Sequence, residues 1–77
     1  MDTAQLAIVE HLAKNHLVRT KELYSYLLSK HFKELDVTEA LTALEKTGHI
    51  SRITPMGDEN LALTKTGLRA AAGQHTR

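Results

Sequence analysis

The sequence contains no cysteine and no tryptophan, only one proline and few aromatic residues. Without cysteine, the chain can form neither a disulfide framework nor a thiolate metal site. Its 77 residues include no apolar run of transmembrane length, and the N-terminus lacks the basic and then apolar layout of a signal peptide. We therefore expect a single cytoplasmic domain with no membrane segment, small enough that pairing with a second copy would add useful stability.

Residues that could support catalysis or hold a metal are also sparse. Zinc requires three or four convergent ligands, and no glycine-rich phosphate loop or pairing of a base with a nucleophile is evident. The sequence therefore predicts no metal site, no cofactor and no enzymatic activity. Aromatic residues that could stack on RNA bases are also few, since only two tyrosines and one phenylalanine are present. The histidines are spread along the chain at His11, His16, His31, His49 and His75.

Charge is nearly balanced overall but is unevenly distributed. The net charge is +1, which gives no general argument for nucleic acid as a partner. The segment 14–33 carries a charge of +4, the segment 34–63 carries −4 and the segment from residue 64 onward carries +3. Any DNA-binding element in the central segment would therefore carry acidic residues where a phosphate-facing surface is usually basic.

Hydrophobic residues at three- and four-residue spacing predict three helices, over residues 3–15, 21–31 and 37–47. Asp2 or Thr3 is suited to cap the first helix and Asn15 to end it, while Thr20 is expected to cap the second. Asp36 and Glu39 have the spacing of a capping box, which predicts that the third helix begins after Asp36.

The second half of the chain alternates between strands and turns. We expect Gly48 to end the third helix with a positive φ, and residues 50–53 and 61–63 to form a hairpin across the turn at residues 55–60. Residues 17–19 are expected to form a short extended segment. Thr64 should cap a last helix that runs to Ala72, with residues 73–77 as a flexible tail. Apolar residues where these elements converge should share one core, namely Leu41, Leu44, Ile50 and Leu63.

Two motifs dominate this region. The first is A-L-x-x-L-E-x-x-G-x-I-x-R from Ala40 to Arg52, and the second is L-x-L-T-x-x-G from Leu61 to Gly67. Together with the helices before them, they resemble the winged helix-turn-helix family, and they look similar to MarR-type and PadR-type regulators. The resemblance implies an α+β, mostly α fold with a three-helix core, a β-hairpin wing and a C-terminal helix, forming one domain over residues 1–72. It suggests a minimal regulator of the kind found on phages, plasmids or in archaea.

The resemblance implies that the third helix enters the major groove of DNA. Thr38, Thr42 and Lys46 lie along one line of that helix, where threonine can contact base edges and lysine can reach phosphate or guanine. Phosphate contacts are then expected from cations on the neighbouring elements, namely Lys21, Lys30, Lys33 and Arg52.

The same resemblance leaves two functional hypotheses. The leading one is a sequence-specific DNA-binding transcriptional regulator that acts as a homodimer on double-stranded DNA. Its dimer contact is predicted at Ile8, a spare apolar residue of the first helix, or at Ala71 in the alanine-rich last helix. The alternative is a protein-interaction winged helix, an inhibitor or adaptor from a mobile element, that binds a protein through its acidic recognition-helix and wing face.

Overall fold

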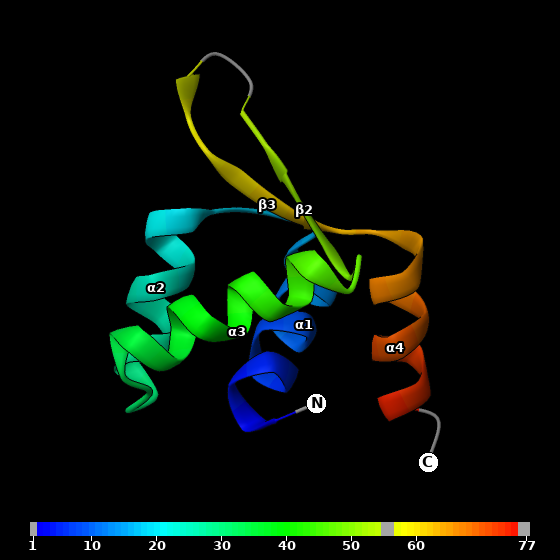
Figure 1. Cartoon of the computed structure of the whole chain (residues 1–77), viewed down its shortest axis with the longest axis horizontal. Helices are drawn as coiled ribbons and strands as arrows, with labels where there is room; N and C mark the ends of the chain where they lie inside the picture. Colours follow the sequence, from blue (N-terminus) through cyan, green and yellow to red (C-terminus); the bar gives the residue numbers. More distant parts are fainter. Residues whose placement is uncertain (1, 55–56, 76–77) are drawn as a thin grey trace.

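The computed structural model describes residues 2–54 and 57–75, the last three as backbone only. Four helices and three strands follow one another as α1 (Thr3–Asn15), β1 (Leu17–Arg19), α2 (Thr20–Ser29), α3 (Glu34–Lys46), β2 (Ile50–Ile53), β3 (Asn60–Leu63) and α4 (Lys65–His75). Helix α3 crosses in front of α1, with α2 on one side and α4 on the other, and the β2–β3 hairpin projects away from the helices as the wing (Figure 1). The predicted fold class, a three-helix core with a hairpin wing and a C-terminal helix, is confirmed.

The sheet joins the wing to the helical core. Its strand order is β1-β3-β2, and both pairs are antiparallel. Val18 of β1 lies opposite Leu61 of β3, and both side chains are buried. The short segment at residues 17–19 is therefore a strand that fixes the base of the wing, which explains why a piece of only three residues is retained between two helices.

One hydrophobic core holds the elements together. Leu41 and Leu44 of α3 and Ile50 of β2 are buried in it, and Leu63 of β3 packs against it while remaining partly exposed. The predicted convergence of these four residues is confirmed. The largest side chains that are fully buried are aliphatic and come mainly from the helices: Ile8, Val9, Leu12, Leu23, Leu27, Val37, Leu41, Leu44 and Leu61.

The two glycines of the sequence motifs have separate structural roles. Gly48 ends α3 with a φ of +78°, a left-handed conformation that side chains with a Cβ rarely adopt. Gly67 lies in the first turn of α4, where an added Cβ would overlap the backbone carbonyl oxygen of His49. Thr64 secures this approach, because its hydroxyl donates to the Gly48 carbonyl and accepts from the Gly67 amide at 3.1 Å. The predicted cap at Thr64 is thus confirmed.

Several predicted helix ends are wrong by one to three residues. Helix α3 begins at Glu34 rather than after Asp36, so Asp36 lies in the first turn, and no side chain caps this helix. Thr20 is the first residue of α2, and its hydroxyl bonds to Glu59 instead of capping. Asn15 remains helical, and His16 takes the positive φ of 64°. At the start of α1 the predicted Asp2 cap is present, and Gln5 completes a capping box.

The predicted surface positions of Ile8 and Ala71 are also wrong. Ile8 is completely buried and Ala71 is only 3% exposed, and both belong to the hydrophobic core of the single chain. Neither side chain is therefore available at the surface for a dimer contact. Helix α4 continues to His75, so the tail predicted from residue 73 is helical over its first three residues. The rest of that tail, residues 76–77, and the wing-turn residues 55–56 lie outside the described residues.

Candidate nucleic-acid interface

Helix α3 presents a row of polar side chains on the side opposite the core. Its buried residues are Val37, Ala40, Leu41 and Leu44. Thr38, Thr42 and Lys46 are all exposed, and at four-residue spacing they follow one line along the helix. The structure therefore brings together the three residues predicted to read base edges, on a helix next to the wing (Figure 1).

Both threonine hydroxyls already have partners within the protein. The Thr38 hydroxyl lies 2.7 Å from the phenol oxygen of Tyr24 on α2, and the Thr42 hydroxyl donates to the Thr38 carbonyl at 3.0 Å. Because the Thr42 proton is used in this bond, its oxygen is left as an acceptor, with the methyl group beside it. Tyr24 joins α2 to α3 at this position, and the sequence reasoning did not assign it this role.

Arg52 of β2 forms ion pairs with two acidic side chains. Its Nε atom lies 2.8 Å from Oε2 of Glu45 on α3, and its Nη1 atom lies 2.6 Å from Oε2 of Glu59, which precedes β3. Glu59 also accepts from the Thr20 hydroxyl at 2.8 Å and, through its backbone carbonyl, from the Thr20 amide at 3.2 Å. We call these four residues the Arg52 cluster. The cluster connects α2, α3, β2 and the residue before β3. Its carboxylates bind the guanidinium group of Arg52, which was predicted to contact phosphate.

These contacts shift the pKa values of Arg52 and Glu59. The hydrogen bond and charge of Glu45, followed by the charge of Glu59, raise the pKa of Arg52 above its usual value. The hydrogen bond from Thr20, together with Arg52, lowers the pKa of Glu59 below its usual 4.5. The cluster is exposed to water, so its main effect is to orient the wing, and its contribution to stability is small.

The four predicted phosphate contacts do not form one continuous surface. Lys21, in the first turn of α2, lines a hollow with the wing residues Asp58 and Glu59. Lys33 directly precedes α3 and is exposed. Lys30 lies elsewhere, because its ammonium group is 5.5 Å from the ring centre of Tyr26 and it lines a hollow with α1. Lys21 therefore lies at the start of the helix-turn-helix and Lys33 in its turn, while Lys30 and Arg52 make other contacts.

An ion pair links β1 to the wing. Arg19 of β1 lies 3.8 Å from Asp58, and both side chains are well exposed. With Glu59 held by Arg52, the described part of the wing pairs each of its two acidic residues with an arginine.

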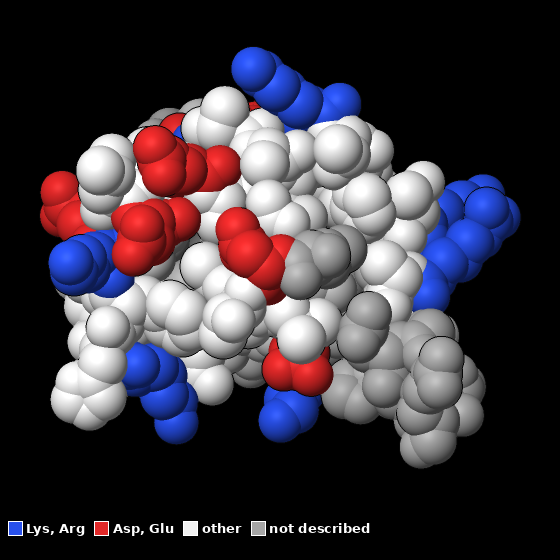
Figure 2. Space-filling model, turned by 60° about the horizontal axis from the view of Figure 1, so that its bottom comes forward, with Lys and Arg blue, Asp and Glu red and all other residues white. Residues whose placement is uncertain are grey.

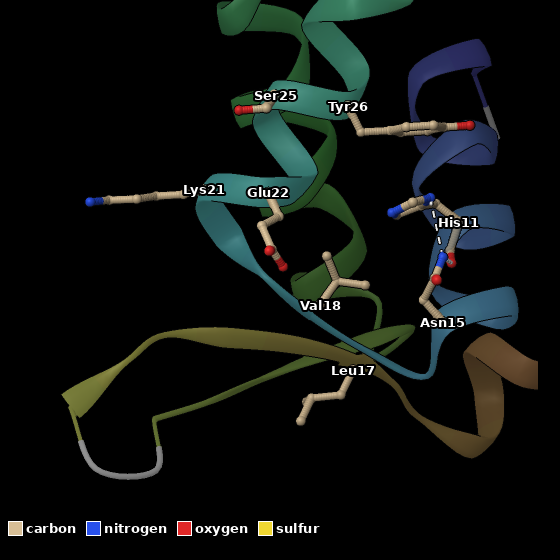
Figure 3. Close-up of a pocket in the computed structure, with 8 residues that line it drawn as sticks. All are labelled: His11, Asn15, Leu17, Val18, Lys21, Glu22, Ser25 and Tyr26. Carbon is tan, nitrogen blue, oxygen red and sulfur yellow. Dashed lines mark hydrogen bonds between the residues drawn. The ribbon is translucent and has the colours of Figure 1, made fainter.

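A shallow cleft of about 560 Å³ lies between α1, α2 and β1. The rings of His11 and Tyr26 stack at one end, with centres 4.1 Å apart, while the Lys21 side chain extends away from them (Figure 3). Partial burial and the nearby charge of Lys14 lower the pKa of His11 below its usual 6.5. The ring pair thus packs α1 against α2, while burial and the charge of Lys14 favour the neutral imidazole.

Within residues 2–54 and 57–75, no group of three or more histidine or acidic side chains is arranged to hold a metal ion. None of the helices in this part of the chain is long and apolar enough to cross a membrane.

Comparison with known proteins establishes the fold. No protein-family model matches the sequence, and no curated protein matches it. Among solved structures, SSV1 F-93 matches with a TM-score of 0.84 at 19% identity, over 99% of this chain and 86% of that one. A mutant of ZitR from Lactococcus lactis matches with a TM-score of 0.81 at 20% identity, over 99% of this chain and 51% of that one. The reduced form of MarR from E. coli matches with a TM-score of 0.81 at 18% identity, over 97% of this chain and 55% of that one.

These matches confirm the winged helix-turn-helix fold that the sequence motifs predicted. The chain spans most of the length of F-93 and about half the length of ZitR and MarR. At 18–20% identity, these likenesses show the fold alone.

Proposed function

We propose that this chain is a small, sequence-specific DNA-binding transcriptional regulator of the cytoplasm. The observation that carries the proposal is the exposed row of Thr38, Thr42 and Lys46 on α3, beside the wing of a winged-helix fold. In such folds the second helix of the helix-turn-helix enters the major groove. MarR-type winged helices are the structural neighbours, and this supports DNA as the ligand.

The hydrogen bonds of the row suggest how it would read bases. The Thr42 oxygen can accept from an exocyclic amino group of adenine or cytosine, and its methyl group can meet a thymine methyl. Lys46, in the last turn of α3, can reach a guanine or a phosphate. Lys33 directly precedes α3, and Lys21 belongs to a helix whose first turn has no side-chain cap, an arrangement that suits a phosphate oxygen.

A salt-titrated binding assay tests the proposal. Purified protein is titrated against random-sequence duplex DNA, and bound sequences are then selected and compared. We expect a linear decrease of log K with log salt concentration, with Lys21→Ala and Lys33→Ala each lowering the slope by about 0.9. A common motif among the selected sequences is also expected. The absence of both salt-dependent binding and a selected motif would remove DNA as the ligand.

We further propose that the regulator acts as a homodimer, with a contact that involves α4. Leu68 on α4 is 48% exposed, a large apolar side chain for the surface of so small a domain. Two copies related by a two-fold axis would each place an α3 helix on one half of a paired DNA site. Sedimentation should show a dimer that Leu68→Asp converts to a monomer, whereas a monomer at every accessible concentration would contradict the dimer.

The second candidate is a winged helix that binds a protein through its acidic surface. It is favoured by the state of Arg52, which Glu45 and Glu59 neutralise, so that the α3 and wing surface retains few free cations. If this candidate is correct, random DNA will not bind at physiological salt. Substitutions at Lys21 and Lys33 will then have no effect on any interaction of the protein.

A further inference from the structure

A second surface of α3 faces the start of α1. Here a groove of about 470 Å³ runs between the two helices. Its floor is apolar, and Ala4 of α1 and Ala40 of α3 are buried there. Ala43 and Phe32 complete the apolar lining and are partly exposed. The alanines leave a shallow space that another side chain can enter without displacing any part of the core.

The rim of this groove is acidic. Asp2, Asp36 and Glu39 line it, and each of them is exposed. Among the described residues, none of these carboxylates lies within ion-pair distance of a lysine or arginine. Figure 2 views the molecule from the side to which the start of α1 points, and acidic side chains cluster over one part of this face while lysine and arginine lie mostly at its edges.

We propose that this acidic groove docks a basic amphipathic segment of another protein, with lysine or arginine residues flanking one apolar side chain. The apolar side chain would rest on Ala40 and Ala43, and the cations would meet Asp36 and Glu39. Charge complementarity selects this occupant, because three carboxylates with no lysine or arginine partner among the described residues, around an apolar floor, favour a ligand that is both cationic and apolar.

The groove is separate from the row predicted to read DNA. Asp36, Glu39 and Ala43 follow one another at three- and four-residue spacing on the α1 side of α3, whereas Thr38 and Thr42 lie on the neighbouring line. Substitutions can therefore alter one surface while leaving the other intact. The peptide interaction goes beyond the proposed DNA function and does not depend on it.

The test uses a fluorescein-labelled synthetic helical peptide of about 15 residues, with lysines on both sides of a central leucine. Binding to the full chain is followed by anisotropy at physiological salt, and the contact is mapped by NMR chemical shifts. The double variant Asp36→Asn/Glu39→Gln should weaken the peptide complex by about threefold to tenfold. The matched control Glu10→Gln removes a carboxylate of α1 that does not line the groove, so it should leave the affinity unchanged.

Three further arms complete the test. Ala43→Gln places a longer side chain in the groove and should also weaken binding, and circular dichroism melts establish that each variant is folded. Replacing the peptide leucine with serine should reduce affinity, since it removes the apolar anchor. DNA binding by the same variants, measured alongside Thr42→Ala, separates this proposal from the proposed function, because only Thr42→Ala should change sequence preference.

Two results would overturn the proposal. One is a loss of peptide affinity that is the same for each carboxylate removed in Asp36→Asn/Glu39→Gln and in Glu10→Gln, which would mean that the peptide responds only to total negative charge. The other is the loss of self-association in the groove variants without any change in peptide affinity, which would identify a second copy of this chain as the occupant.

Discussion

The acidic residues on the two sides of α3 differ in whether an arginine pairs with them. On the wing side, Glu45 meets Arg52, and Arg52 also holds Glu59, so the charges there are balanced within the protein. On the α1 side, Asp36 and Glu39 line a groove without a cation from the described residues at ion-pair distance. The summed charge of the segment conceals this difference. Where the charges are paired they fix the wing, and where they are unpaired they are available to a partner.

The comparison also changes the expected behaviour towards DNA. Arg52 cannot contact a phosphate at full strength while two carboxylates hold it, because any phosphate must compete with them for the guanidinium group. Unpaired carboxylates on the other side repel the DNA backbone. Under the proposed function, we therefore expect the threonine row to contribute more to DNA binding than general attraction to phosphate does.

The largest effect is expected from loss of the support that both sides share. Leu44 is 2% exposed beneath the last turns of α3, so Leu44→Ala should lower the free energy of unfolding by about 2–5 kcal/mol. The exposed Leu35 of the same helix provides a control, since Leu35→Ala should change stability by less than about 0.5 kcal/mol. Urea unfolding measures both, and similar midpoints for the two variants would show that Leu44 does not support α3.

The next effect tests the threonine row between the two acidic sides. Thr42→Val keeps a methyl group but removes the acceptor oxygen, whereas Thr42→Ser keeps the oxygen and removes the methyl group. Each should change the preference at one base pair by about 1–3 kcal/mol, in different ways. Selection of bound sequences with the three proteins measures this. Identical motifs for all three would mean that Thr42 does not face a base.

A smaller effect is expected from Arg52, and it should depend on whether Glu45 and Glu59 are present. In the wild-type protein, Arg52→Ala should change the salt slope of DNA binding only slightly, because Glu45 and Glu59 already neutralise the guanidinium group. In a Glu45→Gln/Glu59→Gln background, the same Arg52→Ala substitution should lower the slope by about 0.9, the value of one phosphate contact. Equal effects in the two backgrounds would show that the cluster does not restrain Arg52.

Elements set by local patterns could be predicted from the sequence. The helical spacing, Gly48 and the Thr64 cap depend on interactions within a few residues, so the helices, the wing and the three-residue strand were all recognised. The burial of Ile8 was missed, because an apolar stripe of the first helix wider than one face was read as exposed on one side. The burial of Ala71 was missed, because the contact of α4 with α1 joins segments far apart in the chain. In the structure, α1 packs against α3, α4 and the sheet, and Ile8 is buried among them.

Contacts between distant residues account for most of the rest. The capping box at Asp36 was plausible locally, but the connection from α2 is tight enough for α3 to begin at Glu34. Thr20 and Glu59 are 39 residues apart, and nothing in the local sequence pairs them. The expected hairpin was a partial indication of the contact between Arg52 and Glu59, because its register places Arg52 opposite Leu61 and so close to Glu59. Whether a charge is free or already paired therefore required the tertiary structure.

The smallest expected effect is the response of the Arg52 cluster to acid. The pKa of Glu59 is lowered in the folded protein by the Thr20 hydroxyl and by Arg52, so the unfolded chain binds a proton at this site more readily than the folded protein does. Its contribution to stability is therefore present above the usual value of 4.5 and is lost as the pH falls through the lower folded pKa.

Thr20→Val should move the folded pKa of Glu59 up towards 4.5, while Thr20→Ser should retain the hydrogen bond and the lowered pKa. NMR titration of the Glu59 carboxyl group measures this shift directly, and thermal melts between pH 3 and 7 follow its effect on stability, with Glu59→Gln as the variant that lacks the titration. Superimposable titration curves for the valine and serine variants would show that Thr20 does not hold Glu59, and the wing side of α3 would then differ from the α1 side by its arginine alone.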